Sequence, residues 1–316
     1  MVCKNKVDFI RAQDPFLCGL IGYAISLLTA RPFCISVHAD YERMNQMDPG
    51  GAAPRFLGSY NLTRHLEKFL LARSDLVLAV SGYIAEYVKR CGARPERVRV
   101  FRHFIDPRFF DPPTETIRAE PPVVSVVSRL SRQKYILDLP RIAVALAGMG
   151  VDFRIEVAGD GEARRELEKK IKDLELSDRI VLLGYQDRQG VADLLGRSSA
   201  CLVLCGGASL LETAAMSKPP VAYDWEWHSE IVETGNTGML VPEGDTFGAA
   251  KALKYLLQNP ELAADMGRQA RERVTEMYQR DHLLETRRAA YAELIGLRSV
   301  DASTRVTSES TVREPQ

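Results

Sequence analysis

Short apolar runs alternate with longer segments of helical periodicity along most of the chain of 316 residues. The short runs are rich in Val and Ile, and they predict strands that are buried on both faces of a sheet. In the first part of the chain these runs are Val7–Ile10, Phe33–Val37, Leu76–Val80 and Val98–Phe101. In the second part they are Val123–Ser128, Phe153–Ala158, Ile180–Leu183, Cys201–Leu204, Val221–Tyr223 and Met239–Val241.

The segments between these strands predict helices, because their apolar residues recur at helical spacing. The clearest are Phe16–Leu28, Leu62–Ala72, Ala163–Leu174 and Val191–Leu195. Apolar strands that alternate with helices are typical of parallel sheets with helices on both faces. We therefore predict an α/β protein with doubly wound parallel sheets.

Two proline pairs, Pro112-Pro113 and Pro121-Pro122, flank a polar stretch and indicate an interdomain linker. We expect a first domain at residues 1–118 and a second at 119–276. The first has only four predicted strands and no glycine-rich first turn, so we expect it to be incomplete. The helical pattern continues through 277–298, and the Ser-, Thr-, Glu- and Arg-rich residues 299–316 predict a disordered tail.

Charge and cysteine content narrow the class of protein. Lys and Arg together number 42, as do Asp and Glu, so no overall positive field favours nucleic acid as a partner. The longest uncharged run, Pro15–Ala30, is shorter than the ~20 residues that span a bilayer, and predicts a core helix. The six cysteines are scattered, Cys201 and Cys205 included, which indicates reduced thiols in the cytoplasm and predicts no metal site.

Cations follow the first strand of the second domain, where doubly wound sheets bind ligands. Arg129 and Lys134 there could neutralise a diphosphate, although a solvated charged loop would have the same sequence. After the next strand, Gly159 and Gly161 suit close backbone approach, but the third glycine of a dinucleotide fingerprint is missing.

The segment from Leu204 to Glu230 carries the most information. Gly206 and Gly207 follow a buried strand, and Ser209 is the expected N-cap of a helix over Leu210–Met216. Free amides at a helix start bind anions such as phosphate. Glu212, one turn further on, is placed to accept hydrogen bonds from a vicinal diol such as ribose, and Glu230 could act similarly. An ordinary strand, turn and helix remains the alternative.

In combination with Leu183-Gly184, Pro220–Asp224 and Thr237–Val241, these motifs resemble the nucleotide-binding half of retaining glycosyltransferases of family 4. The first part of the chain, with Ser36-Val37-His38, fits the same family. The resemblance implies the GT-B architecture of two Rossmann-like domains, with a terminal helix that packs back on the first. It also implies transfer of a hexose from a nucleotide diphosphate sugar to an acceptor hydroxyl, with retention and without a metal or other cofactor.

The resemblance also assigns roles to residues. Arg129 and Lys134 hold the donor diphosphate, Glu212 binds the ribose, and His38 faces the reacting sugar. To the donor site we further assign Gly159, Gly161, Gly206, Gly207, Ser209, Leu210 and Glu230. We interpret His103 and His228 as structural.

One position departs from the family pattern: Leu204 stands where a glutamate normally contacts the transferred sugar. The sugar and the acceptor, whether glycan, glycolipid or small molecule, therefore stay open, as does a peripheral contact of the first domain with the inner face of the membrane. Two alternatives to an active transferase also remain. The first is an inactive or fragmentary nucleotide-sugar-binding subunit, and the second is a related GT-B epimerase or phosphorylase.

Overall fold

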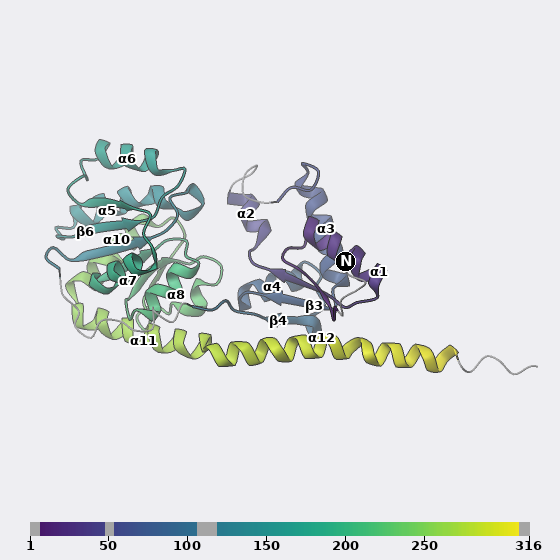
Figure 1. Ribbon diagram of the computed structural model, residues 1–316. Coiled ribbons are helices and arrows are strands. Elements are labelled where there is room, and N and C mark those ends of the chain that lie inside the picture. The colour runs from purple at the N-terminus through teal and green to yellow at the C-terminus, as the bar shows by residue number, and fades with distance from the viewer. Residues whose placement is uncertain (1–6, 48–53, 106–118, 310–316) are drawn as a thin grey trace, which may run out of the picture. The chain divides into compact units, whose positions relative to one another are not determined.

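The computed structural model describes residues 7–47, 54–105 and 119–309, with side chains up to residue 296 (Figure 1). The chain forms two compact units. The first unit comprises residues 1–103 and 280–316, and the second comprises residues 104–279. Of the predicted linker, Pro112-Pro113 lies outside the described residues.

The first unit contains a parallel sheet in the order β1-β2-β3-β4, formed by Ile10–Ala12, Phe33–Val37, Leu76–Ala79 and Val98–Val100. Its other elements are α1 (Leu17–Thr29), α2 (Tyr41–Met47), α3 (Tyr60–Arg73), α4 (Gly82–Arg90), η1 (Pro95–Arg97) and α12 (Arg280–Glu309). The Ser59 and Ser81 hydroxyls cap α3 and α4 by accepting hydrogen bonds from Leu62 N and Ile84 N. These serines explain where both helices begin, because each satisfies an otherwise unpaired first-turn amide.

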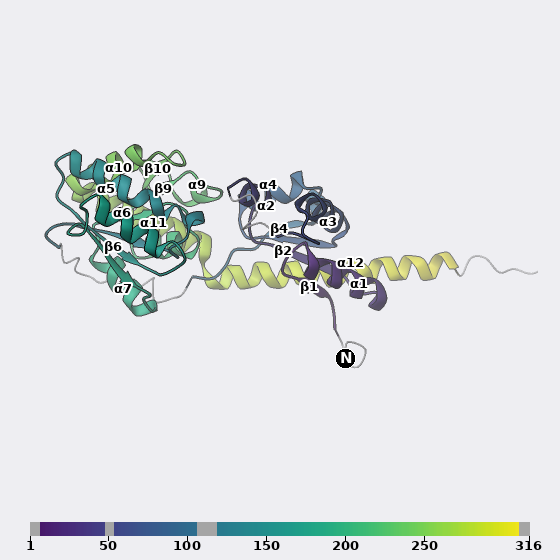
Figure 2. The ribbon, with the colours of Figure 1, turned by 90° about the horizontal axis from the view of Figure 1, so that it is seen from above.

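The two faces of this sheet are covered by different helices. Alternate residues of β2, such as Phe33 and Ile35, pack with α1, α3 and α4, while Cys34 faces a cluster with Ala290 and Leu294 of α12. Figures 1 and 2 show α12 along this unit. The Tyr291 hydroxyl of α12 accepts a hydrogen bond of 2.9 Å from Arg11.

The helix α12 is longer than the sequence predicts. It continues to Glu309, so the expectation of a disordered tail is wrong for residues 299–309. No Gly or Pro occurs between residues 297 and 309, and nothing in the local sequence therefore ends the helix. Residues 310–316 lie outside the described residues.

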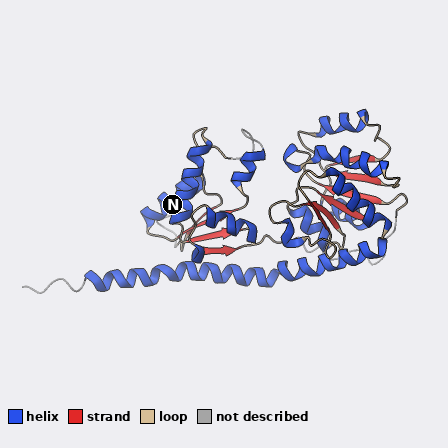
Figure 3. Ribbon diagram, turned by 180° about the vertical axis from the view of Figure 1, so that it is seen from behind, coloured by secondary structure: helices blue, strands red, loops and turns tan. Residues whose placement is uncertain are grey.

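The second unit contains a six-stranded parallel sheet in the order β10-β9-β8-β5-β6-β7 (Figure 3). In chain order the strands β5 to β10 are Val123–Val127, Arg154–Ala158, Ile180–Gly184, Ala200–Val203, Pro220–Tyr223 and Met239–Val241. Its helices are η3 (Arg132–Lys134), η4 (Ile136–Asp138), α5 (Leu139–Gly148), α6 (Arg164–Asp173), α7 (Arg188–Arg197), α8 (Ala208–Ala215), α9 (His228–Ile231), α10 (Thr246–Gln258) and α11 (Pro260–Tyr278).

The order of strands reverses between β5 and β8. From β5 the chain adds β6 and β7 on one side, and then returns to add β8, β9 and β10 on the other. The loops that follow the carboxyl ends of β5 and β8 therefore run in opposite directions. Open α/β sheets bind ligands in the crevice at such a switch point.

Candidate functional site

A pocket of about 400 Å³ opens at this switch point of the second unit. It is formed by the loops that follow β5, β6 and β7 and by the start of α8. Six residues that the sequence assigns to the donor site line it: Arg129, Lys134, Gly159, Gly207, Ser209 and Glu212. The other lining residues include Ser128, Asp160, Tyr185, Gln186 and Cys205.

The loops after β5 and β6 are bound to each other through their backbones. Leu130 N donates to Asp160 O at 3.0 Å, and Ala163 N donates to Leu130 O at 2.9 Å. A Cβ atom at Gly159, whose φ is +145°, would lie 1.9 Å from Ser128 O, and one at Gly161 would lie 2.4 Å from Leu130 O. The two glycines thus permit the loops to touch. Gly159 also lines the pocket, whereas Gly161 is not among the residues that line it.

Two cations reach the pocket from the loop after β5. Arg129 is exposed, and among the described residues no carboxylate pairs with its guanidinium. Lys134 ends the short helix η3, and its Nζ lies 3.8 Å from Cys205 Sγ. Burial raises the pKa of the Cys205 thiol, although the nearby Lys134 ammonium opposes this shift. The thiol is therefore neutral near pH 7, and the charge of Lys134 stays available to an anion.

The helix α8 begins two residues earlier than predicted. Gly207 is its N-cap and makes no side-chain capping bond, so Ser209 lies inside the first turn and its prediction as N-cap was wrong. The Gly207 backbone, with φ −141° and ψ −113°, lets the chain enter the helix at once. First-turn amides without a side-chain cap, together with the helix dipole, favour an anion at this end of the pocket. Leu210 is fully buried, and its side chain belongs to the core.

The amide of Gly206 has a protein partner and is not available to a ligand. Gly206 N donates to His228 Nε2 at 3.0 Å, and His228 Nδ1 lies 2.8 Å from Tyr223 O. The buried ring thus joins the turn after β8 to the end of β9, which agrees with the structural interpretation of His228. Burial lowers the pKa of His228 to about 4, so the ring is neutral near pH 7. Gly206 also does not line the pocket, so its assignment to the donor site finds no support in this geometry.

Leu204 is buried in the main hydrophobic core of the second unit and contributes nothing to the pocket. Glu212, by contrast, is half-buried one turn into α8 and lines the pocket. Glu230 is not among the lining residues. Its carbonyl oxygen accepts a hydrogen bond of 2.7 Å from Arg273 Nε, which places it beside α11.

His38 belongs to the first unit, where it follows β2 at the carboxyl edge of the sheet. Its ring stacks on His103 with centroids 5.4 Å apart, and its Nε2 lies 3.3 Å from Gln13 Oε1. Burial lowers the pKa of both histidines, and the neighbouring Arg11 adds to the effect. His38 follows β2 and His103 follows β4, so the stacking joins the carboxyl ends of two strands that β3 separates.

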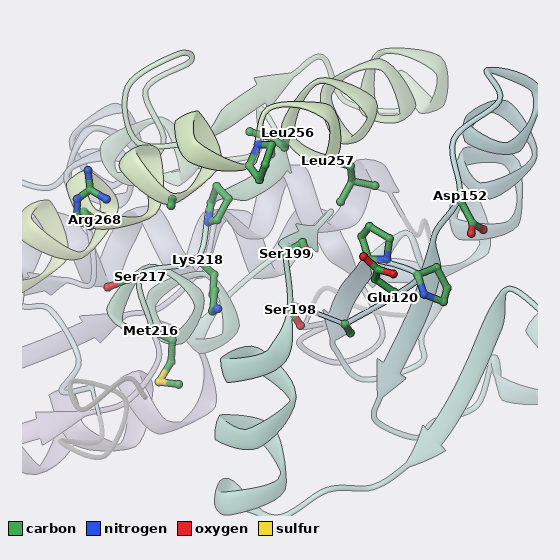
Figure 4. A pocket seen from close by; sticks show the side chains of 16 residues that line it. Glu120, Asp152, Ser198, Ser199, Met216, Ser217, Lys218, Leu256, Leu257 and Arg268 are labelled. Carbon is green, nitrogen blue, oxygen red and sulfur yellow. The ribbon is translucent and has the colours of Figure 1, made fainter. Parts of the chain in front are cut away.

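A larger cavity of about 870 Å³ lies at the amino ends of the strands of the second sheet, on the side opposite to the switch-point pocket (Figure 4). It is lined by Glu120, Asp152, Ser199, Lys218 and Arg268 among others. Lys218 is buried, and its Nζ donates to Gly196 O at 2.7 Å. None of the residues predicted for the donor site lines this cavity. Within the described residues, no group of three His, Cys, Asp or Glu side chains is arranged to hold a metal ion.

Comparisons with known proteins agree with this geometry. The family profile "Glycosyl transferases group 1" matches residues 108–273, more than half of the chain, and "Glycosyltransferase Family 4" matches residues 2–109. Alpha-D-kanosaminyltransferase of Streptomyces kanamyceticus is 26% identical over 262 residues, covering 78% of this chain and 67% of that protein. N-acetyl-alpha-D-glucosaminyl L-malate synthase of Bacillus anthracis is 28% identical over 250 residues, covering 76% of this chain and 65% of that protein.

Solved structures show the same fold. Sucrose-phosphate synthase from Thermosynechococcus elongatus superposes with a TM-score of 0.80 at 21% identity, covering 93% of this chain and 75% of that one. Anabaena HepE in complex with UDP-glucose gives a TM-score of 0.73 at 20% identity, covering 91% and 78%. The chain spans about two thirds of the length of the two curated relatives named above. The two parallel-sheet units have the GT-B architecture, and the chain belongs to the group 1 family of glycosyltransferases.

Proposed function

We propose that the second unit binds a nucleotide diphosphate sugar in the switch-point pocket and that the protein transfers the sugar to an acceptor hydroxyl. The observation that carries the proposal is the convergence of Arg129, Lys134, the start of α8 and Glu212 on one pocket. The first three suit a diphosphate, and Glu212 suits the ribose hydroxyls. HepE, a structural neighbour, was solved with UDP-glucose, which agrees with this class of donor.

The same groups supply the chemistry. As the bond between the sugar and the diphosphate breaks, negative charge grows on the departing phosphate. Arg129, Lys134 and the first-turn amides of α8 are placed to stabilise that charge more strongly in the transition state than in the bound donor. We infer that these groups do the work that a divalent metal does in other transferases, so that transfer is independent of metal.

We further propose that the anomeric configuration is retained. Two carboxylates line the pocket, and neither is suited to act as a covalent nucleophile. Asp160 accepts hydrogen bonds from Gly161 N at 2.7 Å and Arg164 NH1 at 3.1 Å, and Glu212 is assigned to the ribose. A displacement on one face of the sugar, assisted by the leaving phosphate, fits this arrangement.

The acceptor is a glycan, a glycolipid or a small molecule. Cys18, Cys34, Cys91, Cys201 and Cys205 are free thiols, in agreement with work in the cytoplasm.

Calorimetry of the full chain with UDP, GDP and ADP in the presence of EDTA tests the donor site. We expect one of them to bind, and Arg129→Ala to weaken binding. Arg132→Ala is the matched control, because Arg132 lies in the same loop but pairs with Glu166 and does not line the pocket. Binding that requires a metal, or an equal loss in both variants, would contradict the proposal.

A nucleotide-sugar-binding protein without transferase activity is the second candidate, favoured by the burial of Leu204 in the core. Such a protein would bind the nucleotide, but it would release no UDP when a UDP-sugar and any acceptor are added together. Product analysis separates the remaining alternatives, because an epimerase needs no acceptor and a phosphorylase consumes inorganic phosphate. The anomeric configuration of the product, read by NMR, tests retention.

A further inference from the structure

The helix α1 of the first unit turns its apolar side chains away from the core. Its buried residues are the small ones, Gly19, Gly22 and Ser26. A Cβ atom at Gly19 would lie 2.7 Å from Asp14 O, and one at Gly22 would lie 2.9 Å from the Phe33 ring. The helix therefore cannot rotate to bury its larger side chains, since only the glycine face fits against β1 and β2.

Three exposed apolar residues of α1 form one stripe on the opposite side. Leu17 is 56% exposed, Ile21 52% and Leu28 87%. Helical geometry places these three residues about half a turn from Gly19, Gly22 and Ser26, so they face directly away from the sheet. Another helix of the same layer would cover the flank of α1 and leave this stripe open. Among the described residues of the unit, no side chain covers this stripe.

The neighbouring helix α3 extends this apolar surface. The rings of Tyr23 in α1 and Phe69 in α3 meet edge to face with centroids 5.8 Å apart, so the two helices lie side by side. Leu62 and Phe69 on α3 are also exposed. We call the outward side of α1 and α3, with Leu17, Ile21, Leu28, Leu62 and Phe69, the α1–α3 face.

The charges around the α1–α3 face are positive. Within α1 no residue is charged, and the single carboxylate of α3, Glu67, is buried and paired with Arg64. The exposed charged residues next to the apolar ones are Lys68 and Arg73 on α3 and Arg31 just after α1. The Arg73 guanidinium lies 3.8 Å from the centre of the Phe69 ring. Asp14, at the start of α1, accepts a hydrogen bond from Phe16 N.

We propose that the α1–α3 face docks on a membrane surface that contains anionic lipids, with α1 lying in the plane of the interface. Apolar side chains enter the boundary between headgroups and acyl chains, and the flanking cations meet lipid phosphates. No helix among the described residues is long and apolar enough to cross a membrane, so the contact is peripheral. Anionic lipid fits this face better than a protein partner, because its acyl chains accept the apolar stripe and its phosphates pair with the excess of cations.

Docking of this kind goes beyond the proposed transfer reaction and does not depend on it. The α1–α3 face belongs to the first unit, whereas the donor pocket belongs to the second. Loss of docking should therefore leave nucleotide affinity unchanged, and loss of nucleotide binding should leave docking unchanged.

Co-sedimentation of the full chain with vesicles tests the proposal. We expect binding to phosphatidylglycerol vesicles, weaker binding to pure phosphatidylcholine, and a decline as salt rises. Leu28→Glu and Ile21→Glu should each weaken binding about tenfold or more, since each removes an inserted apolar side chain. Leu174→Glu is the matched control, because Leu174 is 45% exposed at the end of α6 in the second unit.

Charge reversal gives a second, independent readout. Lys68→Glu should weaken binding to phosphatidylglycerol about fivefold or more, whereas Lys169→Glu, on the exposed surface of α6, should have no effect. Nucleotide affinity of every variant, measured in parallel, shows that the second unit is intact. Three results would overturn the proposal: no vesicle binding by the wild type, equal binding by the α1 variants and the Leu174 control, or a wild-type dimer that Leu28→Glu separates while vesicles bind neither form.

Discussion

The buried His228 should make the second unit sensitive to mild acid. Its pKa lies at about 4 in the folded protein, against 6.5 for a free histidine. Since the folded pKa is lowered, the stabilisation is complete above about pH 6.5 and is lost as the pH falls towards 4. The difference in pKa corresponds to roughly 3 kcal/mol in total, of which roughly 2 kcal/mol is lost between pH 7 and pH 5.

The physical reason lies in the two hydrogen bonds of the ring. The neutral ring accepts from Gly206 N through Nε2 and donates to Tyr223 O through Nδ1. Protonation would put a second N–H opposite the Gly206 amide and a charge in a buried site. The turn that precedes α8 would then lose its anchor, so acid should weaken nucleotide binding as well as stability.

Urea unfolding followed by tryptophan fluorescence measures this effect in one unit alone. The two tryptophans of the chain, Trp225 and Trp227, both lie in the second unit, and His228 is the only histidine in its sequence. His228→Gln should lower the stability at pH 7 and abolish roughly 2 kcal/mol of the loss between pH 7 and pH 5. His65→Gln, on α3 of the first unit, should change neither. An equal loss with pH in the wild type and His228→Gln would refute the reasoning.

Three further predictions follow from the same contacts. Gly159→Ala should destabilise the second unit by roughly 3 kcal/mol, since its Cβ would lie 1.9 Å from Ser128 O at a positive φ. Gly148→Ala is the control, because a Cβ atom there meets no other atom within 4 Å, and urea unfolding of both variants measures the difference. Glu212→Gln should weaken UDP binding roughly ten- to a hundredfold in calorimetry, with Glu168→Gln on α6 as the neutral control; unchanged affinity would remove Glu212 from the site. Leu294→Ala, which truncates a side chain 1% exposed in the core beneath α12, should cost the first unit roughly 2–5 kcal/mol, seen as faster amide exchange in β2 and β3 with an unchanged tryptophan transition. Equal exchange in both proteins would show that α12 does not stabilise this sheet.

The strands were predictable because most of them are buried on both faces. Phe33–Val37 and Met239–Val241 have the bounds that the sequence predicts, and every other predicted strand overlaps an observed one. The first strand begins at Ile10 and not at Val7. Phe9 stacks on Tyr291 of α12, a contact between residues far apart in sequence that local pattern cannot reveal.

The site was predictable in its parts and less so in its hydrogen bonds. Residues after the carboxyl ends of parallel strands converge by topology alone, which explains why Arg129, Lys134 and Glu212 share a pocket. The partner of the Gly206 amide is instead His228, the first residue of α9, which lies 22 residues further along the chain. In the same way, the sequence of α1 predicts a core helix, but the glycines that fix its inner face leave its leucines exposed.

A crystal structure of the protein with UDP tests the central claim most directly. The account predicts the nucleotide in the pocket at the switch point, with the diphosphate between Arg129, Lys134 and the start of α8 and the ribose hydroxyls at Glu212. Arg132, paired with Glu166 in the same loop, should stay away from the ligand. A nucleotide bound in the larger cavity at the amino ends of the strands, beside Lys218, would contradict the account.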